Sequence, residues 1–254
     1  MVSPRRIVYQ FPISHYCEKT RWQLDAKGLA YEVENLPPGL HRARLRSLGG
    51  ETVPAMHDGD VFLADSVAIA QHIERTYPVR PLLPSNEPMR ARVLELCQYF
   101  DEEIGPSVRL YVYGHLTRDG AAFHRPFFKG YSRSVYALGY LFGRPIRGAI
   151  RKMYGIGQET VADSLSRVLK GIAYLESALD GDSARYLAGG VLSMADITAA
   201  ALLAPLVMPK GSPYEDAGAL PKELLDLCRE VRGRPAGQWV LNRYAKDRAA
   251  HQAH

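Results

Sequence analysis

The stretch ETVPAMHDGDVFLADSVAIAQHIERTYP, residues Glu51 to Pro78, decides the fold of this chain. The apolar runs Thr52–His57 and Val61–Ala64 predict two short strands. The Asp58-Gly59 pair between them predicts a two-residue hairpin turn, because both central positions of such a turn need positive φ. Pro54 cannot donate to a sheet ladder, so it belongs at an edge, a strand start or a cis bend.

A helix follows the hairpin. Asp65 and Ser66 open it, and apolar residues recur at four-residue spacing until Pro78 stops it: Ile69, Ile73 and Tyr77. The pattern places a carboxylate, a hydroxyl and free backbone N–H groups at a positive helix end. Such an end fits the carboxylate of an amino acid.

The residues before this stretch predict a βαβ unit. Arg6–Phe11 and Ala30–Leu36 have strand patterns, and a helix from about Cys17 to Lys27 lies between them, closed by Gly28. The two strands should therefore be parallel, with a right-handed crossover. With the hairpin and helix that follow, the order is that of a thioredoxin-like α/β domain over residues 1–78.

A second, all-helical domain is expected after a linker. Residues 79–87, VRPLLPSNE, show no periodicity and contain two prolines, whereas the periodicity of residues 88–254 is helical only. Two helices carry the clearest apolar stripes, Val93, Cys97, Phe100 and Ile104 in the first and Val161, Leu165, Val168, Ile172, Leu175 and Leu179 in the later one. Leu224 to Val231 and the Gly233-Arg234-Pro235 break predict the last helices.

Ser193 and Asp196 predict a capping box. Ser193 caps a helix, Asp196 reaches back to the Ser193 amide, and Leu192 packs against Ile197. From capping alone, Asp196→Ala should cost roughly 0.5–2 kcal/mol.

Composition is that of a globular protein, with 46% hydrophobic and 23% charged residues among 254. The N-terminus resembles a strand more than a signal peptide, so we expect a cytoplasmic protein. The three cysteines lack a CxxC pair, which argues against a disulfide framework and a structural zinc site, and no metal is expected. The run Val191–Met208 contains polar residues, so a membrane span is not expected.

The hairpin stretch resembles the glutathione-binding half of glutathione transferases. In that family the proline after Val53 is cis, the backbone of the preceding residue pairs with the cysteinyl part of glutathione, and an acidic-Ser pair holds its γ-glutamyl end. The resemblance assigns these roles to Val53, Pro54, Asp65 and Ser66. The capping box, SMAD, is similar to the family's buried folding motif. An ordinary hairpin with a capped helix is the competing interpretation.

The loop after the first strand resembles the catalytic segment of omega-type and tau-type transferases. This register puts Ser14 at the catalytic position, where its hydroxyl would donate to the glutathione sulfur and lower a thiol pKa of ~8.5 toward neutrality. The alternative is a turn or N-cap serine. Tyr16 is also expected to contact glutathione, whereas Tyr9 is expected in the core of the strand. Cys17 is expected as a small buried hydrophobe, with thiol exchange as a second hypothesis.

His41 and Arg42 stand where the family often has a basic residue for the glycine carboxylate of glutathione, although a solvated face explains them as well. His15 replaces the family's usual proline.

The resemblance does not cover about Asp119 to Gly157, an aromatic and basic insertion into the helical domain. Three interpretations compete. The insertion walls the electrophile site and favours aromatic or anionic substrates, it lies on an acidic membrane surface, or it is a helical hairpin packed by its aromatic residues. Nucleic acid is not expected as a partner because no recognised motif is present.

The resemblance implies a glutathione transferase that conjugates glutathione, its co-substrate, to a small hydrophobic electrophile and forms a homodimer. Two alternatives remain at this point. One is a non-enzymatic binding or scaffold protein that acts through the insertion, and the other is glutathione-dependent thiol exchange through Cys17.

Overall fold

A computed structural model describes residues 4–216 and 218–252. Its N-terminal part is a four-stranded sheet in the order β2-β1-β3-β4, in which β1 is parallel to β2 and antiparallel to β3. This confirms the predicted thioredoxin-like arrangement. The strands are β1 (Arg6–Gln10), β2 (Glu32–Asn35), β3 (Ala55–Asp58) and β4 (Val61–Ala64).

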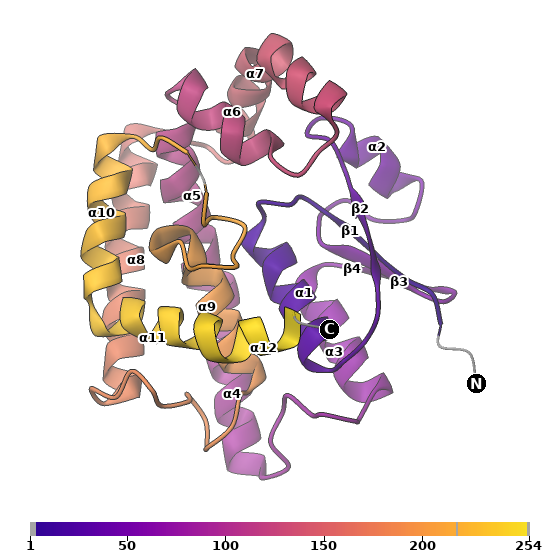
Figure 1. Ribbon diagram of the computed structural model, residues 1–254, viewed down its shortest axis with the longest axis vertical. Helices are drawn as coiled ribbons and strands as arrows, with labels where there is room; N and C mark the ends of the chain where they lie inside the picture. The colour runs from indigo at the N-terminus through magenta and orange to yellow at the C-terminus, as the bar shows by residue number, and fades with distance from the viewer. Residues whose placement is uncertain (1–3, 217, 253–254) are drawn as a thin grey trace.

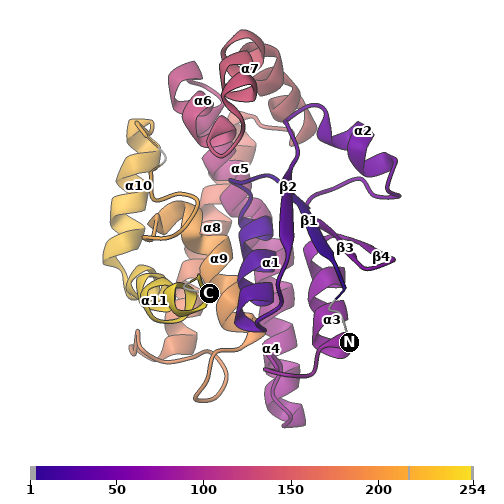
Figure 2. The ribbon, with the colours of Figure 1, turned by 45° about the vertical axis from the view of Figure 1, so that its right-hand side comes forward.

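Three helices cover the two faces of this sheet. On one face, Val8 and Met56 pack against Leu24 of α1 and Ile69 of α3, whereas on the other face Tyr9 packs against Leu45 of α2. Figure 2 shows α1 and α3 on one side of the sheet and α2 on the other. The helices are α1 (His15–Ala26), α2 (His41–Arg46) and α3 (Ser66–Thr76).

The remaining elements are helical, as predicted. They run from α4 to α12 with two short π-helical segments: α4 (Glu87–Tyr99), η1 (Phe100–Ile104), α5 (Gly105–Leu116), α6 (Gly120–Phe128), α7 (Arg133–Met153), α8 (Gln158–Leu179), α9 (Met194–Val207), α10 (Lys222–Gly233), α11 (Pro235–Arg243), η2 (Tyr244–Arg248) and α12 (Ala249–Gln252). Within the described ranges, α6 and α7 fill the insertion and form the outer edge of the molecule (Figure 1).

Helix α9 forms the centre of the helical part. All its residues are buried, and α1 packs along it, so the sheet domain and the helical domain share a core. This packing explains the long apolar run near Val191 as a core helix. None of the helices in the described part of the chain is both long and apolar enough to span a bilayer.

The capping box at the start of α9 is confirmed. The Asp196 carboxylate accepts hydrogen bonds from the Ser193 amide and hydroxyl at 2.8 and 2.6 Å, and from the Leu187 amide at 2.8 Å. Asp196 has no exposed surface, and burial raises the pKa of its carboxyl to about 6 against the opposing effect of these hydrogen bonds. The motif therefore ties the preceding loop to the helix as well as capping it.

The hairpin differs in detail from the prediction. The turn falls on Gly59 and Asp60 instead of Asp58-Gly59, and β3 begins only after Pro54. Asp58 is held in the strand because its buried carboxylate pairs with Arg6 at 2.9 Å and accepts a hydrogen bond from the Tyr77 hydroxyl at 2.6 Å. The tendency of the Asp58-Gly59 pair to form the turn was outweighed by this buried ion pair.

Candidate functional site

The sheet topology gathers several of the predicted site residues at one end of the N-terminal domain. Tyr9 near the end of β1 lies opposite Ala55 at the start of β3, so the loop after β1 and the Val53–Pro54 segment lie at the same end of the sheet. The Val53–Pro54 peptide is cis, as the family resemblance implied. The Asp65 amide donates to the Pro54 carbonyl at 3.0 Å, which brings the start of α3 to this end.

Ser14 caps the N-terminus of α1. Its Oγ accepts a hydrogen bond from the Cys17 amide at 3.3 Å, and its own amide donates to the Phe11 carbonyl at 3.0 Å. Because Oγ acts here as an acceptor, the hydroxyl proton stays available for donation to a ligand atom. Capping and catalysis, treated as alternatives for Ser14 in the sequence, are therefore compatible.

Asp65 caps α3 through one of its two carboxylate oxygens. Oδ1 accepts from the Val67 and Ala68 amides at 2.7 and 2.9 Å, whereas Oδ2 has no hydrogen-bond partner within the described residues. Asp65 is exposed and has positive φ (72°), and the adjacent Ser66 is buried. The free oxygen can accept from a cationic group while the helix end attracts an anionic one, a pairing that suits an amino-acid zwitterion.

His41 and Arg42 lie at the start of α2, beside the loop after β1. The His41 ring packs edge-on against Phe11, with ring centroids 4.8 Å apart. Burial, with a smaller effect from Arg42, lowers the pKa of His41, so the imidazole is neutral at pH 7. Arg42 is exposed and supplies the positive charge at this position.

Tyr16 contacts the helical domain, and Cys17 is buried next to it in α1. The Tyr16 hydroxyl donates to the Asp101 carbonyl at 2.6 Å, so its proton is already used at the domain interface, and its contact with glutathione stays a prediction. Cys17 is fully buried, and burial raises the pKa of its thiol despite a hydrogen bond with Ser14. Since the thiolate is the reactive form, this environment disfavours thiol exchange.

A cavity of about 250 Å³ adjoins this end of the sheet. One wall comes from the N-terminal domain and the other from α5 and the insertion. The first wall consists of Phe11, Ile13, Pro38, Gly39, His41 and Arg42, and the second of Tyr113, Phe127, Tyr131, Ile146, Ala149, Ile150, Met153 and Tyr154. Apart from His41 and Arg42 the lining is apolar and aromatic, with no Asp or Glu from the described part of the chain.

Contacts between the domains fix the position of the insertion. The Tyr131 hydroxyl donates to the Leu36 carbonyl at 2.8 Å, and the Asn35 side-chain Nδ2 donates to the Gly130 carbonyl at 3.0 Å. These bonds connect the end of β2 to the turn between α6 and α7. The insertion therefore walls the cavity, which agrees with the first of the three interpretations made from the sequence.

Sequence reasoning missed Arg109, which contacts Tyr154 in the cavity wall. The Arg109 guanidinium lies over the Tyr154 ring at 4.7 Å and has no carboxylate partner among the described residues. A cationic side chain in the otherwise apolar run Val108–Val112 was the available signal. Behind the cavity, burial lowers the pKa of His15 to about 3, and the Arg109 charge adds a smaller lowering.

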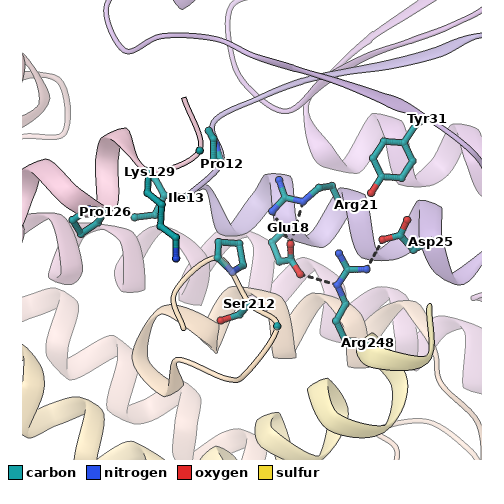
Figure 3. Close-up of a pocket in the computed structure, with 13 residues that line it drawn as sticks. Pro12, Ile13, Glu18, Arg21, Asp25, Tyr31, Pro126, Lys129, Ser212 and Arg248 are labelled. Carbon is teal, nitrogen blue, oxygen red and sulfur yellow. Dashed lines mark hydrogen bonds and ion pairs between the residues drawn. The ribbon is translucent and has the colours of Figure 1, made fainter. Parts of the chain in front are cut away.

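A larger cavity of about 540 Å³ lies between α1 and the C-terminal segment and shares Ile13 with the first. Figure 3 shows Glu18 between Arg21 and Arg248, with Asp25 beside Arg248, whereas Lys129 stands apart from this group. Arg248 bonds Glu18 at 2.9 Å and also pairs with Asp25. Because these charges satisfy one another, we assign this cluster to holding α1, and with it the Ser14 loop, against the helical domain.

Comparisons with known proteins match this geometry. A family model described as "Glutathione S-transferase, N-terminal domain" matches residues 8–86. A glutathione S-transferase of Triticum aestivum is 29% identical over 106 residues, 42% of this chain and half the length of that relative. The FtsZ-localized protein A of Caulobacter vibrioides is 26% identical over 94% of each chain. The structure of a glutathione S-transferase from Rhodospirillum rubrum F11 superposes with a TM-score of 0.55 at 22% identity, over 93% of this chain and 91% of that one.

Proposed function

We propose that this chain, whose residues 8–86 match the N-terminal domain of glutathione S-transferases, conjugates glutathione to a small apolar electrophile. The observation that carries the proposal is the position of two helix N-termini, capped by Ser14 and Asp65, at the end of the sheet that adjoins the apolar cavity. Glutathione offers a zwitterionic end, a thiol and a second carboxylate, and this end of the sheet offers a partner for each.

In the proposed complex, the Asp65 Oδ2 accepts from the γ-glutamyl ammonium while Ser66 and the start of α3 bind the adjacent carboxylate. The Val53 backbone pairs with the cysteinyl unit, beside the cis peptide of Pro54. Arg42, with the neutral His41, binds the glycine carboxylate. These contacts would place the thiol near Ser14, at the positive end of α1.

The chemical step requires the thiolate of glutathione. The thiol proton leaves to solvent, and the Ser14 hydroxyl donates to the resulting sulfur anion, assisted by the helix end. The sulfur lone pair then attacks the electrophilic carbon, a C–S bond forms, and the leaving group departs with its bonding electrons. Ser14 donates a hydrogen bond throughout and forms no covalent bond.

The cavity walled by the insertion is the proposed electrophile site. Tyr113, Phe127 and Tyr154 offer ring faces and edges, and α7 adds Ile146, Ile150 and Met153. Such a lining selects flat, apolar molecules, because aromatic side chains favour stacked and edge-on ring contacts.

Conjugation of an aryl halide by the purified protein tests the proposal. Ser14→Gly removes the hydroxyl at little capping cost, and Ser14→Thr keeps both hydroxyl and cap. Losing one hydrogen bond to a charged group, ~1.5–3 kcal/mol, should lower kcat/KM by roughly 10- to 100-fold in Ser14→Gly. Ser14→Thr should retain most activity, and Ser85→Ala, at an exposed serine of the linker, should match the wild type. Equal kcat/KM in the Gly variant and the wild type would remove Ser14 from the mechanism.

A second candidate function is a non-enzymatic binding role. The observation that favours it is the alignment over 94% of both chains with a protein named for its localisation with FtsZ and not for an activity. Calorimetry separates the candidates, because an enzyme binds glutathione and turns over an electrophile. A protein that binds no glutathione and has no turnover would support the binding role.

We also propose that the protein is a cytoplasmic homodimer, which the family resemblance implied. Light scattering on the purified protein tests the dimer, and cell fractionation tests the location.

A further inference from the structure

Helix α7 leaves most of its apolar side chains in water. Of its 21 described residues only Gly139 is buried. Leu138, Leu141 and Phe142 are 51%, 76% and 52% exposed, and their three- and four-residue spacing puts them on one face of the helix. An exposed apolar patch of this kind marks an interaction site.

The apolar patch continues onto the N-terminal domain. Leu40, just before α2, is 69% exposed. It faces α7 across an apolar groove of about 480 Å³ that Leu138, Phe142 and Pro145 also line. Both views place α7 at the outer edge of the molecule, with α2 near one end of it (Figures 1 and 2). We call the exposed surface of Leu40, α2 and α7 the α2–α7 face.

The charge of the α2–α7 face has a single sign. Residues 36–50 and 120–158 contain no Asp or Glu. Apart from Arg42, which lines the candidate-site cavity, four exposed cationic side chains on the two helices form no ion pair within the described residues: Arg46, Arg133, Arg144 and Lys152. Arg44, also on α2, is neutralised by Glu34 at 3.0 Å. The apolar patch is therefore bordered by uncompensated positive charge.

We propose that the α2–α7 face binds the surface of an anionic phospholipid membrane. Leu40, Leu141 and Phe142 enter the boundary between headgroups and acyl chains, and the cationic side chains contact lipid phosphates. An amphipathic helix with apolar and basic residues binds in this way, with a strength set by the buried apolar area and by attraction to anionic lipid.

The charge pattern favours lipid over a second copy of the chain or a folded partner. Two α2–α7 faces brought together would oppose like charges, which is unfavourable. A folded partner would have to present an acidic patch whose shape and charges match this face. A layer of anionic headgroups requires nothing more than cations and inserting apolar side chains.

Vesicle flotation with the full chain tests the proposal. The probes are vesicles of phosphatidylcholine alone and vesicles of equal parts phosphatidylcholine and phosphatidylglycerol. The wild type should float with the anionic vesicles and not with the neutral ones. Salt at about 1 M should weaken binding, because it shortens the Debye length to ~3 Å.

Three variants locate the contact. Leu141→Glu should reduce partitioning by about tenfold or more, because it removes an inserting side chain and adds a like charge to the lipid. Arg144→Glu reverses one charge and should reduce partitioning by about fivefold or more. Val191→Glu is the matched control, since Val191 is 72% exposed in the α8–α9 connection, at the opposite end of the molecule from α7 (Figure 1), and should bind as the wild type does.

Circular dichroism and size-exclusion chromatography confirm that each variant is folded. The proposal is overturned if the wild type does not float with anionic vesicles, if it binds neutral vesicles equally, or if Leu141→Glu binds as well as Val191→Glu. The proposal is also overturned if the wild type binds neither kind of vesicle and Leu141→Glu converts an oligomer into monomers. That result would show that a second copy of the chain occupies this face.

Discussion

Asp65 allows the structural and ligand-binding roles of one side chain to be separated. Its Oδ1 caps α3 through two amide hydrogen bonds, and its Oδ2 is left for the ammonium group of glutathione. Asp65→Asn keeps the capping oxygen and replaces Oδ2 by an NH₂ group, which can only donate. Asn has the same shape as Asp, so this substitution leaves the backbone conformation of the position, φ 72° and ψ 157°, unchanged.

The capping role and the binding role predict different changes in the free energy of unfolding and in the affinity for glutathione. Asp65→Asn should change the free energy of unfolding by less than about 0.5 kcal/mol, and Asp65→Ala should lower it by about 1–2 kcal/mol. A hydrogen bond to a charged group is worth ~1.5–3 kcal/mol, and because Asp65 is exposed we take the lower value. Both variants should therefore bind glutathione about tenfold more weakly.

Calorimetric titration with glutathione and thermal unfolding of the same samples provide the measurements. The informative variant is Asp65→Asn, which should have the melting temperature of the wild type but a lower affinity for glutathione. Wild-type affinity in Asp65→Asn would refute the reasoning, because the free oxygen would then contact no ammonium group. Equal melting temperatures for Asp65→Ala and the wild type would refute the capping role.

Two further predictions concern stability. Burial lowers the pKa of His15 to about 3 from an ordinary ~6.5, so the neutral ring contributes stability above pH ~6.5 that is lost as the pH falls toward 3. Unfolding midpoints measured over this range should fall less in His15→Gln than in the wild type, and parallel curves would contradict this. Asp196→Ala should lower the free energy of unfolding by roughly 2–6 kcal/mol, since it removes the acceptor of the buried Ser193 amide and hydroxyl and of the partly buried Leu187 amide. Denaturant titration measures the change, and a loss below about 1 kcal/mol would mean that the carboxylate is replaced by other acceptors.

Local sequence signals predicted the elements that depend on neighbouring residues. The starts of α3 and α9 could be predicted from the sequence, because their capping residues bond to groups within three positions along the chain. The same holds for the apolar stripes of α4 and α8, whose periodicity reports the buried face directly.

Contacts between segments that are distant in the chain could not be predicted from the sequence. Asp58 stayed in its strand because Arg6, far away in the sequence, pairs with it. The direction of Tyr16 depends on Asp101, and the cavity wall depends on α5 and α7 meeting the loop after β1. Composition identified the insertion as unusual, but only the packing assigns its aromatic residues to the cavity and its leucines to the outer surface.

The central claim is that the Ser14 hydroxyl stabilises the thiolate of glutathione. Ultraviolet absorbance of the thiolate, followed against pH with saturating protein, gives the pKa of the bound thiol. One hydrogen bond of ~1.5–3 kcal/mol corresponds to a lowering by about 1–2 units from ~8.5. The wild type and Ser14→Thr should show this lowering, and Ser14→Gly should lose most of it. Equal thiol pKa values in the wild type and Ser14→Gly would contradict the account.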